Sequence, residues 1–419
     1  MSKKRNKKKK PPQKYSTTKQ AVPQFKELLY RAMKRVGFEA YFSLLKDLEL
    51  EYMTISIYRS TRPTSLPGYQ ITSSRLQLIN NMNQLGLRRR MVLVDSVYMS
   101  VLECNSLFGL ADFLEQKAEG IVRLSEFRTK FCDRFRAEKL LELLTDGCNI
   151  VYLRTILYLS NPKERYYAFK NTLETNVVSP ILMRYNSEIS VHQAQSSILT
   201  IHGINRPVFR LGKPGAKSQF NWIRISSKLI GDHYKGKEKE LGVYIQSHAL
   251  NRLKERLDII DNLSLNYQLI VSTYNIKAFE FYKGYLLLPF LTYHNVKVGY
   301  LVANVIGDKL VFRTFLFVTH SSTPEGDKLK KITGLQKSDI KYWHFDRLST
   351  LVSADVDANS AMHKLLKEIG IEDLLKLKTI IRDTDNYQDN FVDELMAYIE
   401  RGKKEIEEES HWESASCLD

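Results

Sequence analysis

The chain has 419 residues, a net charge of +16 and a hydrophobic fraction of 43%. This length and apolar content suit two or three globular domains, and they exclude a chain that is disordered throughout. The most apolar stretch, residues 285–292, is much shorter than the roughly 20 residues that cross a bilayer. We therefore expect a soluble protein without a membrane partner.

The positive charge is concentrated near the N-terminus but extends beyond it. Nine Lys and Arg residues lie within residues 1–22, and the rest of the chain still carries a net charge of +7. A basic arm on a basic body indicates a nucleic-acid partner, RNA more than DNA, although a lysine tail can also serve solubility alone. The N-terminus lacks the apolar core of a signal peptide, and the four cysteines have no paired or metal-ligand spacing. These features favour reduced thiols and a cytoplasmic location.

The first half of the chain is predicted to be a basic arm followed by helices. Residues 1–22 are expected to be disordered, and residues 23–190 to form a mainly helical domain. Within it we expect helices over 24–37 and 39–49, a strand over 52–58, and mostly helical segments over 74–186. Arg88, Arg89 and Arg90 lie between two of these segments, where a solvated helix end is favoured over a phosphate contact.

The second half is predicted to contain a sheet. Residues 191–330 are expected to form an α+β domain with a twisted antiparallel sheet, and Gly307-Asp308 to form a tight hairpin. The predicted strands cover 198–201, 208–211, 220–225, 269–274, 285–293, 296–306 and 310–320. Residues 331–402 are predicted to be C-terminal helices, and 403–419 an acidic tail. The expected fold class is therefore α+β, with a helical N-terminal domain, then the sheet domain and C-terminal helices.

A strand followed by a basic helix, over residues 244–258, is the clearest local pattern. Ser247 is a predicted N-cap, and His248, Arg252 and Arg256 recur at i, i+4 and i+8 on one helix face. Leucines on the opposite face would hold the helix against a core. Histidine suits proton transfer near neutral pH, and arginine suits phosphate. The alternative is structural: His248 caps the helix while the arginines form surface ion pairs with nearby carboxylates.

The strand over residues 311–320 is a second candidate. Strict alternation places Arg313 on one face with Phe315 and Phe317, and Phe312 on the other face with His320. Arg313 is then expected to meet a carboxylate or to face a binding cleft, while His320 ends the strand, a usual position for a functional side chain. The following Thr-Pro-Glu-Gly at 323–326 is predicted to be a turn.

A third group combines carboxylates and histidines: His344 with Asp346, Asp355 with Asp357, and His363. Two carboxylates at this spacing can bind a divalent metal, but loop solvation or helix capping is the favoured interpretation because further ligands are lacking. The sequence contains no P-loop, G-x-G-x-x-G, H-E-x-x-H or G-x-S-x-G motif. We therefore expect neither a metal nor a cofactor.

The segment Gln246-Ser-His-Ala-Leu-Asn-Arg-Leu-Lys-Glu-Arg256, with the strands that follow it, resembles the RelE/BrnT-like toxin superfamily. The resemblance covers about residues 240–325, and its pattern rests on Ser247, His248, Ala249, Arg252, Glu255 and Arg256. Ser247 directly precedes His248, without the intervening residue of the pattern. The resemblance implies a ribonuclease fold in which basic residues of helix and sheet assist cleavage, with Arg313 contacting the scissile phosphate.

Together these patterns predict an RNA-binding protein with metal-independent endoribonuclease activity. His248 would be the acid or base, Arg252, Arg256 and Arg313 the phosphate contacts, and His320 a second proton carrier. One alternative is a non-catalytic nucleic-acid-binding or structural protein of phage or mobile-element origin. Another is an interaction module whose basic surface binds an acidic protein partner.

Overall fold

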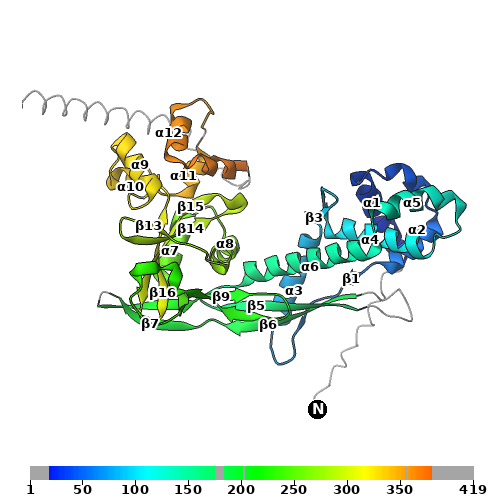
Figure 1. The fold of residues 1–419 in the computed structure, drawn as a ribbon, viewed down its shortest axis with the longest axis horizontal. Helices are drawn as coiled ribbons and strands as arrows, with labels where there is room; N and C mark the ends of the chain where they lie inside the picture. The colour runs from blue at the N-terminus through cyan, green and yellow to red at the C-terminus, as the bar shows by residue number, and fades with distance from the viewer. Residues whose placement is uncertain (1–17, 175–183, 202, 355, 380–419) are drawn as a thin grey trace, which may run out of the picture. The chain divides into compact units, whose positions relative to one another are not determined.

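The computed structural model (Figure 1) describes residues 18–174, 184–201, 203–354 and 356–379, which form two compact units. The first unit contains residues 18–155, 169–174, 184–190 and 216–218. The second contains residues 156–168, 191–201, 203–215, 219–354 and 356–379. Helices and sheets both occur, so the fold is α+β. The end of the predicted C-terminal helices, from residue 380 to 402, the acidic tail and most of the basic arm lie outside the described residues.

The first unit is mainly helical. Its helices are α1 (Thr18–Arg35), α2 (Asp47–Ser56), α3 (Ser73–Leu87), α4 (Val101–Gln116), α5 (Ser125–Arg134) and most of α6 (Ala137–Leu159), with the 3₁₀ segments η1 (Glu39–Leu44) and η2 (Val122–Leu124). Helix α4 is almost entirely buried. Its start is fixed by a capping box, in which the Ser100 backbone N–H donates to Glu103 Oε2 at 2.8 Å and Ser100 Oγ accepts from the Glu103 backbone N–H at 3.2 Å.

Several local predictions for this region are wrong. Helix α1 begins at Thr18, earlier than predicted, and contains Pro23. Residues 47–56 are helical where a strand was expected from residue 52, because Leu50 and Met53 are buried at helical spacing and Glu49 caps the first turn. The region also contains strands: β1 (Arg59–Ser60), β2 (Thr64–Ser65), β3 (Arg90–Val94), β4 (Val97–Ser100), β5 (Arg165–Glu174) and β6 (Arg184–Gln193). The predicted end of the first helix near Gly37 is confirmed, since Gly37 adopts φ +80°.

The second unit is built on an eight-stranded sheet in the order β13-β14-β15-β16-β12-β8-β7, with β11 paired to β12. Its strands are β7 (Ser196–Ile201), β8 (Ile204–Arg210), β11 (Arg224–Ser226), β12 (Glu240–Gln246), β13 (Glu280–Tyr282), β14 (Tyr285–Leu291), β15 (Lys297–Ile306) and β16 (Lys309–Phe317). Strands β9 (Gly212–Pro214) and β10 (Phe220–Trp222) form a separate pair. The ladders of the eight-stranded sheet are antiparallel except for β12–β16, which is parallel. The predicted Gly307-Asp308 hairpin joins β15 and β16, and Gly307 has φ +58°.

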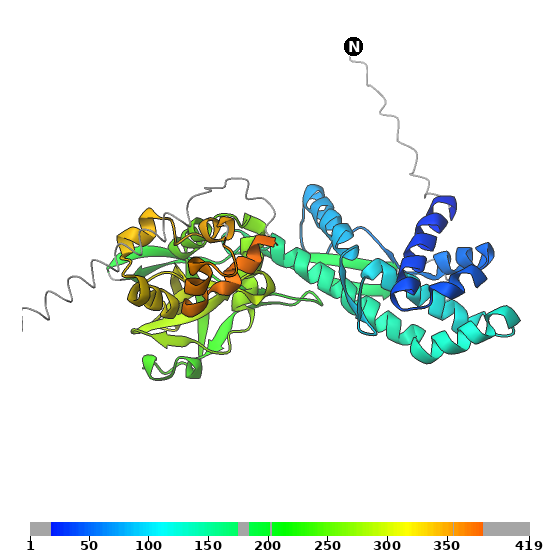
Figure 2. The same ribbon diagram turned by 90° about the horizontal axis from the view of Figure 1, so that it is seen from above.

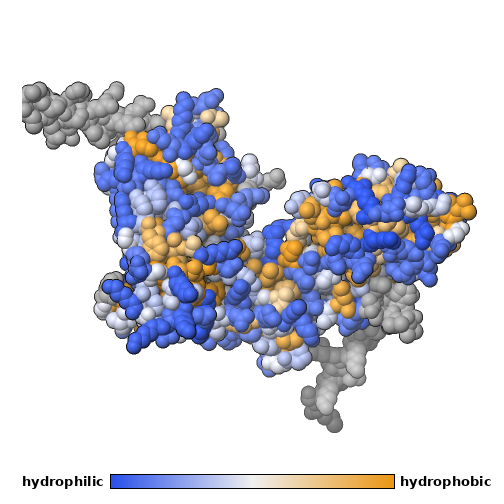
Figure 3. Space-filling view, viewed as in Figure 1, coloured by the Kyte–Doolittle hydropathy of each residue, from blue (hydrophilic) through white to orange (hydrophobic). Residues whose placement is uncertain are grey.

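Helices and 3₁₀ segments cover this sheet: α7 (Ser247–Arg256), α8 (Asn262–Tyr274), α9 (Pro324–Thr333), α10 (Lys337–Tyr342), α11 (Leu348–Ser353), α12 (Ala361–Ile369), η4 (Ser227–Leu229), η5 (Gly231–His233), η6 (Tyr293–Asn295) and η7 (Glu372–Thr379). Figures 1 and 2 show α9–α12 gathered on one side of the unit. One continuous apolar core joins the sheet to α7, α8, α9, α11, α12 and η7. On the face drawn in Figure 3, mostly hydrophilic residues cover this unit, and hydrophobic residues are visible in patches.

Two segments of the second unit have a secondary structure other than the predicted one. Residues 269–274 belong to helix α8, not to a strand, because Asp261 caps the helix by accepting from the backbone N–H groups of Leu263 and Ser264 at 2.9 and 3.0 Å. The predicted turn at 323–326 is the start of helix α9, with Thr323 as its N-cap and Pro324 at its first position. In both segments the residues that cap a helix determine the structure, although the composition of the short segment favoured a strand or a turn.

Candidate functional site

A cavity of about 500 Å³ lies in the second unit, at the place where β12 ends and α7 begins. Strand β12 pairs with β16 from Lys309 to Phe312 and then gives way to α7. The remaining part of β16, residues 314–317, borders the cavity. The other walls come from α7, the loop after β16, α9, α10 and residues 344–347. Segments that are distant in the sequence therefore meet at one site.

Helix α7 presents its polar face to this cavity. Ala249, Leu250 and Leu253 are buried on the opposite face, which fixes the rotation of the helix. His248, Arg252, Glu255 and Arg256 consequently line the cavity. The N-cap is Gln246, without a side-chain hydrogen bond, and not Ser247 as expected, so the helix begins one residue earlier than the sequence predicts.

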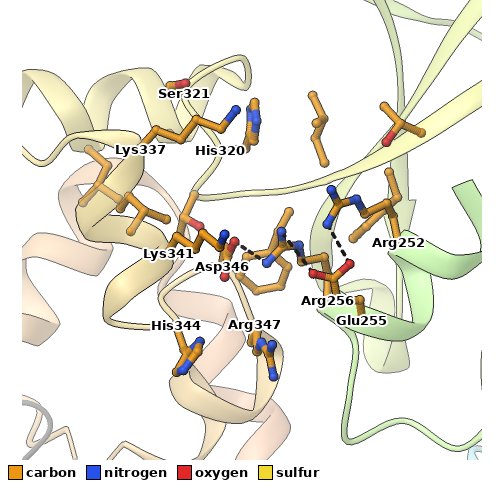
Figure 4. Close-up of a pocket in the computed structure, with 18 of the residues that line it drawn as sticks. Arg252, Glu255, Arg256, His320, Ser321, Lys337, Lys341, His344, Asp346 and Arg347 are labelled. Carbon is orange, nitrogen blue, oxygen red and sulfur yellow. Dashed lines mark hydrogen bonds and ion pairs between the residues drawn. The ribbon is translucent and has the colours of Figure 1, made fainter. Parts of the chain in front are cut away.

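A chain of charged side chains crosses the cavity (Figure 4). Glu255 Oε2 accepts from Arg252 Nη1 at 2.7 Å, and Glu255 Oε1 lies 3.5 Å from Arg256 Nη2. Arg256 also forms an ion pair with Asp346, and these two side chains are only 17% and 14% exposed. Burial raises the pKa of Asp346, and the neighbouring Arg256 acts in the opposite direction. Asp346 Oδ1 is buried without a hydrogen-bond partner among the described residues.

Strand β16 ends at Phe317, so His320 lies in the loop that follows and does not end the strand as predicted. This loop holds His320 in a defined orientation. The backbone N–H of Ser322 donates to His320 Nδ1 at 3.1 Å, so the neutral imidazole carries its proton on Nε2. Thr323 Oγ1 donates to the carbonyl of Val318 at 2.6 Å and accepts from the Gly326 backbone N–H at 3.0 Å. A Cβ at Gly326 would lie 2.0 Å from the His320 carbonyl oxygen, so only glycine allows this close approach of loop and helix.

Two of the cavity histidines, His248 and His320, are biased towards the neutral form. Burial lowers the pKa of His320, with Lys337, Arg256 and Arg252 adding to the effect. The pKa of His248 is lowered by burial, then by Arg252 and Arg206, while Glu255 opposes the shift. A neutral imidazole near neutral pH is able to accept a proton, as a general base must.

Arg313 does not line the cavity. A bulge in β16 separates Thr314, which faces Val302, from Phe312, which faces Ala303, so Arg313 has no partner on β15. Phe312 therefore joins Phe315 and Phe317 in the main core, contrary to the predicted alternation. The Arg313 guanidinium lies 5.5 Å from the centre of the Tyr285 ring, and its buried Nε has no hydrogen-bond partner among the described residues. Within the described part of the chain, Arg313 meets neither the carboxylate nor the binding cleft that was predicted for it.

The structure thus brings four predicted residues, His248, Arg252, Arg256 and His320, to one cavity and leaves Arg313 outside it. It adds residues that the sequence analysis did not select, chiefly Lys330, Lys337, Lys341 and Arg347. The spacing of Lys337 and Lys341 at i and i+4 was a signal that could have suggested them. In total six Lys and Arg side chains line the cavity against two carboxylates, with three histidines. This balance favours an anionic ligand.

Of the third predicted group, His344 and Asp346 line the cavity, and Asp346 forms an ion pair with Arg256. His363 and Asp357 do not line it, and Asp355 lies outside the described residues. The described part of the chain holds no group of three or more His, Cys, Asp or Glu side chains that could surround a metal ion. None of the helices described combines the length and apolar content that a bilayer crossing requires. Cys104 and Cys148 are buried free thiols, and burial raises the pKa of each to about 12.

Comparison with known proteins adds no assignment: no family model, no curated protein and no solved structure matches the chain.

Proposed function

We propose that the second unit binds RNA and cleaves it without a metal ion. The observation that carries this proposal is the meeting of His248 and His320 with Arg252 and Arg256 in one cationic cavity. The resemblance of the α7 segment to the RelE/BrnT-like toxin superfamily supports the same reaction. Phosphate is the anion that fits best, because arginine binds phosphate oxygens through two parallel hydrogen bonds.

In the proposed reaction, His248 accepts the proton of a ribose 2′-hydroxyl. The 2′ oxygen then attacks the adjacent phosphorus and the bond from phosphorus to the 5′ oxygen breaks. The products are a 2′,3′-cyclic phosphate and a 5′-hydroxyl, whose proton comes from solvent; the proton on His248 returns to solvent. Arg252 and Arg256 stabilise the charge on the phosphate, and the Nε2–H of His320 donates to a phosphate or departing oxygen.

The test is cleavage of end-labelled single-stranded RNA in EDTA. We expect His248→Ala to reduce the rate by about 100-fold or more, as for loss of a general base. His320→Ala is expected to cost about 10-fold or more, as for loss of one hydrogen bond to a charged group. The matched control is His363→Ala, on α12 and outside the cavity, which should leave the rate unchanged.

The alternative function is nucleic-acid binding without cleavage, which the basic composition favours equally. RNA that is retained by the wild-type protein but remains intact would establish that alternative. Absence of RNA binding at low salt would contradict both, because phosphate contacts are strongest there.

A further inference from the structure

The Lys and Arg side chains that line the cavity differ in their ion pairs. Arg252 and Arg256 are held by Glu255 and Asp346, so protein carboxylates already offset part of their charge. Lys330, Lys337 and Lys341 form no ion pair with any described residue. The single acidic residue of α10, Asp339, is turned to the helix start, where its Oδ2 accepts from the Gln336 backbone N–H at 2.7 Å.

Two of the lysines without an ion pair, Lys337 and Lys341, lie apart from Arg252. Lys337 and Lys341 are one helical turn apart on α10, so their ammonium groups can reach one ligand together. In Figure 4 they lie on one side of His320, and Arg252 lies on the other side. Lys337 points towards His320 in this view. The cavity therefore has Arg252 on one side and Lys337 and Lys341 on the other, with His320 between them.

The size and lining of the cavity fit more than a single phosphate group. Its volume of about 500 Å³ lies within the range of sites for whole small molecules. Apolar side chains of Leu316, Leu335 and Ile340 also line it, which suits the ribose and base that separate phosphates in a nucleic acid.

We propose that the cavity binds two consecutive phosphates of one RNA strand, with the scissile phosphate at His248, Arg252 and His320 and the neighbouring phosphate at Lys337 and Lys341. This inference rests on the proposed function and defines its substrate class: an oligonucleotide with at least two phosphates, not a mononucleotide. Two separate cationic groups give the strand a register, because a single phosphate occupies only one of them.

The test is equilibrium binding of two small probes, adenosine 3′-monophosphate and adenosine 3′,5′-bisphosphate, measured by calorimetry at low salt. We expect the full chain to bind the bisphosphate about 10-fold more tightly than the monophosphate, as for one added charge-assisted contact. The double variant Lys337→Ala/Lys341→Ala should lose this ratio, while its affinity for the monophosphate changes at most about twofold. Arg252→Ala should weaken the binding of both probes.

The control is Lys364→Ala/Lys367→Ala, which removes the same charge from the exposed face of α12 and should keep the 10-fold ratio. Equal affinities for both probes in the wild type would overturn the two-phosphate site. A ratio that survives in Lys337→Ala/Lys341→Ala, or is lost in the control, would also overturn it.

The proposed function and the two-phosphate site can be refuted by different results. The proposed function fails if the wild type leaves RNA intact in EDTA, whatever the probe ratio, whereas cleavage combined with equal probe affinities refutes only the two-phosphate site.

Discussion

Two charged clusters lie in the second unit, and they differ in how completely their groups are paired. The first, here the cavity cluster, consists of His248, Arg252, Glu255, Arg256, His320, Lys337, Lys341 and Asp346. The second, here the β15–α9 cluster, consists of Lys297, Tyr300 and Glu325. In the β15–α9 cluster Tyr300 Oη donates to Glu325 Oε1 at 3.0 Å, and Lys297 Nζ lies 2.6 Å from the same oxygen.

The extent to which its charged groups are paired determines whether each cluster stabilises the fold or can bind a ligand. Burial and the Glu325 carboxylate raise the pKa of Tyr300, so the phenol keeps its proton and donates it within the cluster. Lys297 further donates to Tyr300 Oη at 2.8 Å, which leaves the three groups bonded to one another. The cavity cluster instead retains lysines without an ion pair among the described residues and a carboxylate oxygen without a hydrogen bond. A paired buried cluster stabilises a fold, and an incompletely paired one has capacity for a ligand.

The largest effect is expected from a substitution that removes Glu325 from the β15–α9 cluster. Glu325→Ala removes the carboxylate that accepts from the buried Tyr300 hydroxyl and pairs with the Lys297 ammonium, and we expect a loss of about 3 kcal/mol in the free energy of unfolding. Glu255→Ala, in the cavity cluster, should change it by less than about 0.5 kcal/mol, because Arg252 is partly exposed to solvent and Arg256 keeps its ion pair with Asp346. The measurement is urea denaturation followed by tryptophan fluorescence, since Trp222 and Trp343 belong to the second unit.

Equal losses for the two variants would show that the clusters do not differ in this way. Tyr300→Phe is the milder control, because it keeps the ion pair between Lys297 and Glu325, and it should cost about 1 kcal/mol.

The next prediction compares Arg252 and Arg313, both of which the sequence predicts to contact phosphate. Arg252→Ala removes a phosphate contact and should slow RNA cleavage by about 10- to 100-fold, equivalent to one charged hydrogen bond. Arg313→Ala should leave the rate within about twofold, because Arg313 packs against Tyr285 and does not line the cavity. The comparison uses initial rates at one low RNA concentration. A loss for Arg313→Ala as large as that for Arg252→Ala would refute the separation of Arg313 from the site.

Arg313 also shows where sequence reasoning reaches its limit. The period-2 pattern correctly predicted a strand around residues 310–317, yet a one-residue bulge at Arg313 reversed its face. No residue type marks that bulge, because its position depends on pairing with β15. The helical face of α7 was predicted correctly, because a helix fixes the positions i, i+4 and i+8 locally.

That α7 and α10 line the same cavity could not be predicted either, for a related reason. Lys337 and Lys341 are about 80 residues from Arg256 in the sequence, and only the packed core brings them together. A parallel β12–β16 pair within an otherwise antiparallel sheet places α7 beside the end of β16. Such non-local pairing leaves no periodic pattern in a single sequence.

A smaller effect is expected when Arg252 loses its ion pair with Glu255. Glu255 competes with a bound phosphate for Arg252 and Arg256, so Glu255→Gln should strengthen binding of uncleavable 2′-O-methyl RNA by about threefold to tenfold. Fluorescence anisotropy at fixed salt would measure this gain. The matched control is Glu240→Gln, because Glu240 pairs with Arg224 in the same unit and outside the cavity. A similar gain in the control would assign the effect to net charge alone.

The smallest expected effect lies in the pH dependence of cleavage. In the proposed reaction His248 must be neutral, so kcat/KM should fall as the pH drops through its pKa in the free protein. Burial, Arg252 and Arg206 lower that pKa, which places the acid limb of the profile below the ordinary value of 6.5. Arg206→Ala removes one of these cations without touching the cavity lining, and should move the limb to higher pH.

Lys337→Ala distinguishes the two histidines in the same experiment. Lys337 helps to lower the pKa of His320 and is not among the groups that shift His248, so this variant should leave the acid limb in place. A shift with Lys337→Ala and none with Arg206→Ala would mean that His320, not His248, is the titrating base. Because the Nδ1 of His320 already accepts from the Ser322 N–H, that result would also require the loop to open during the reaction.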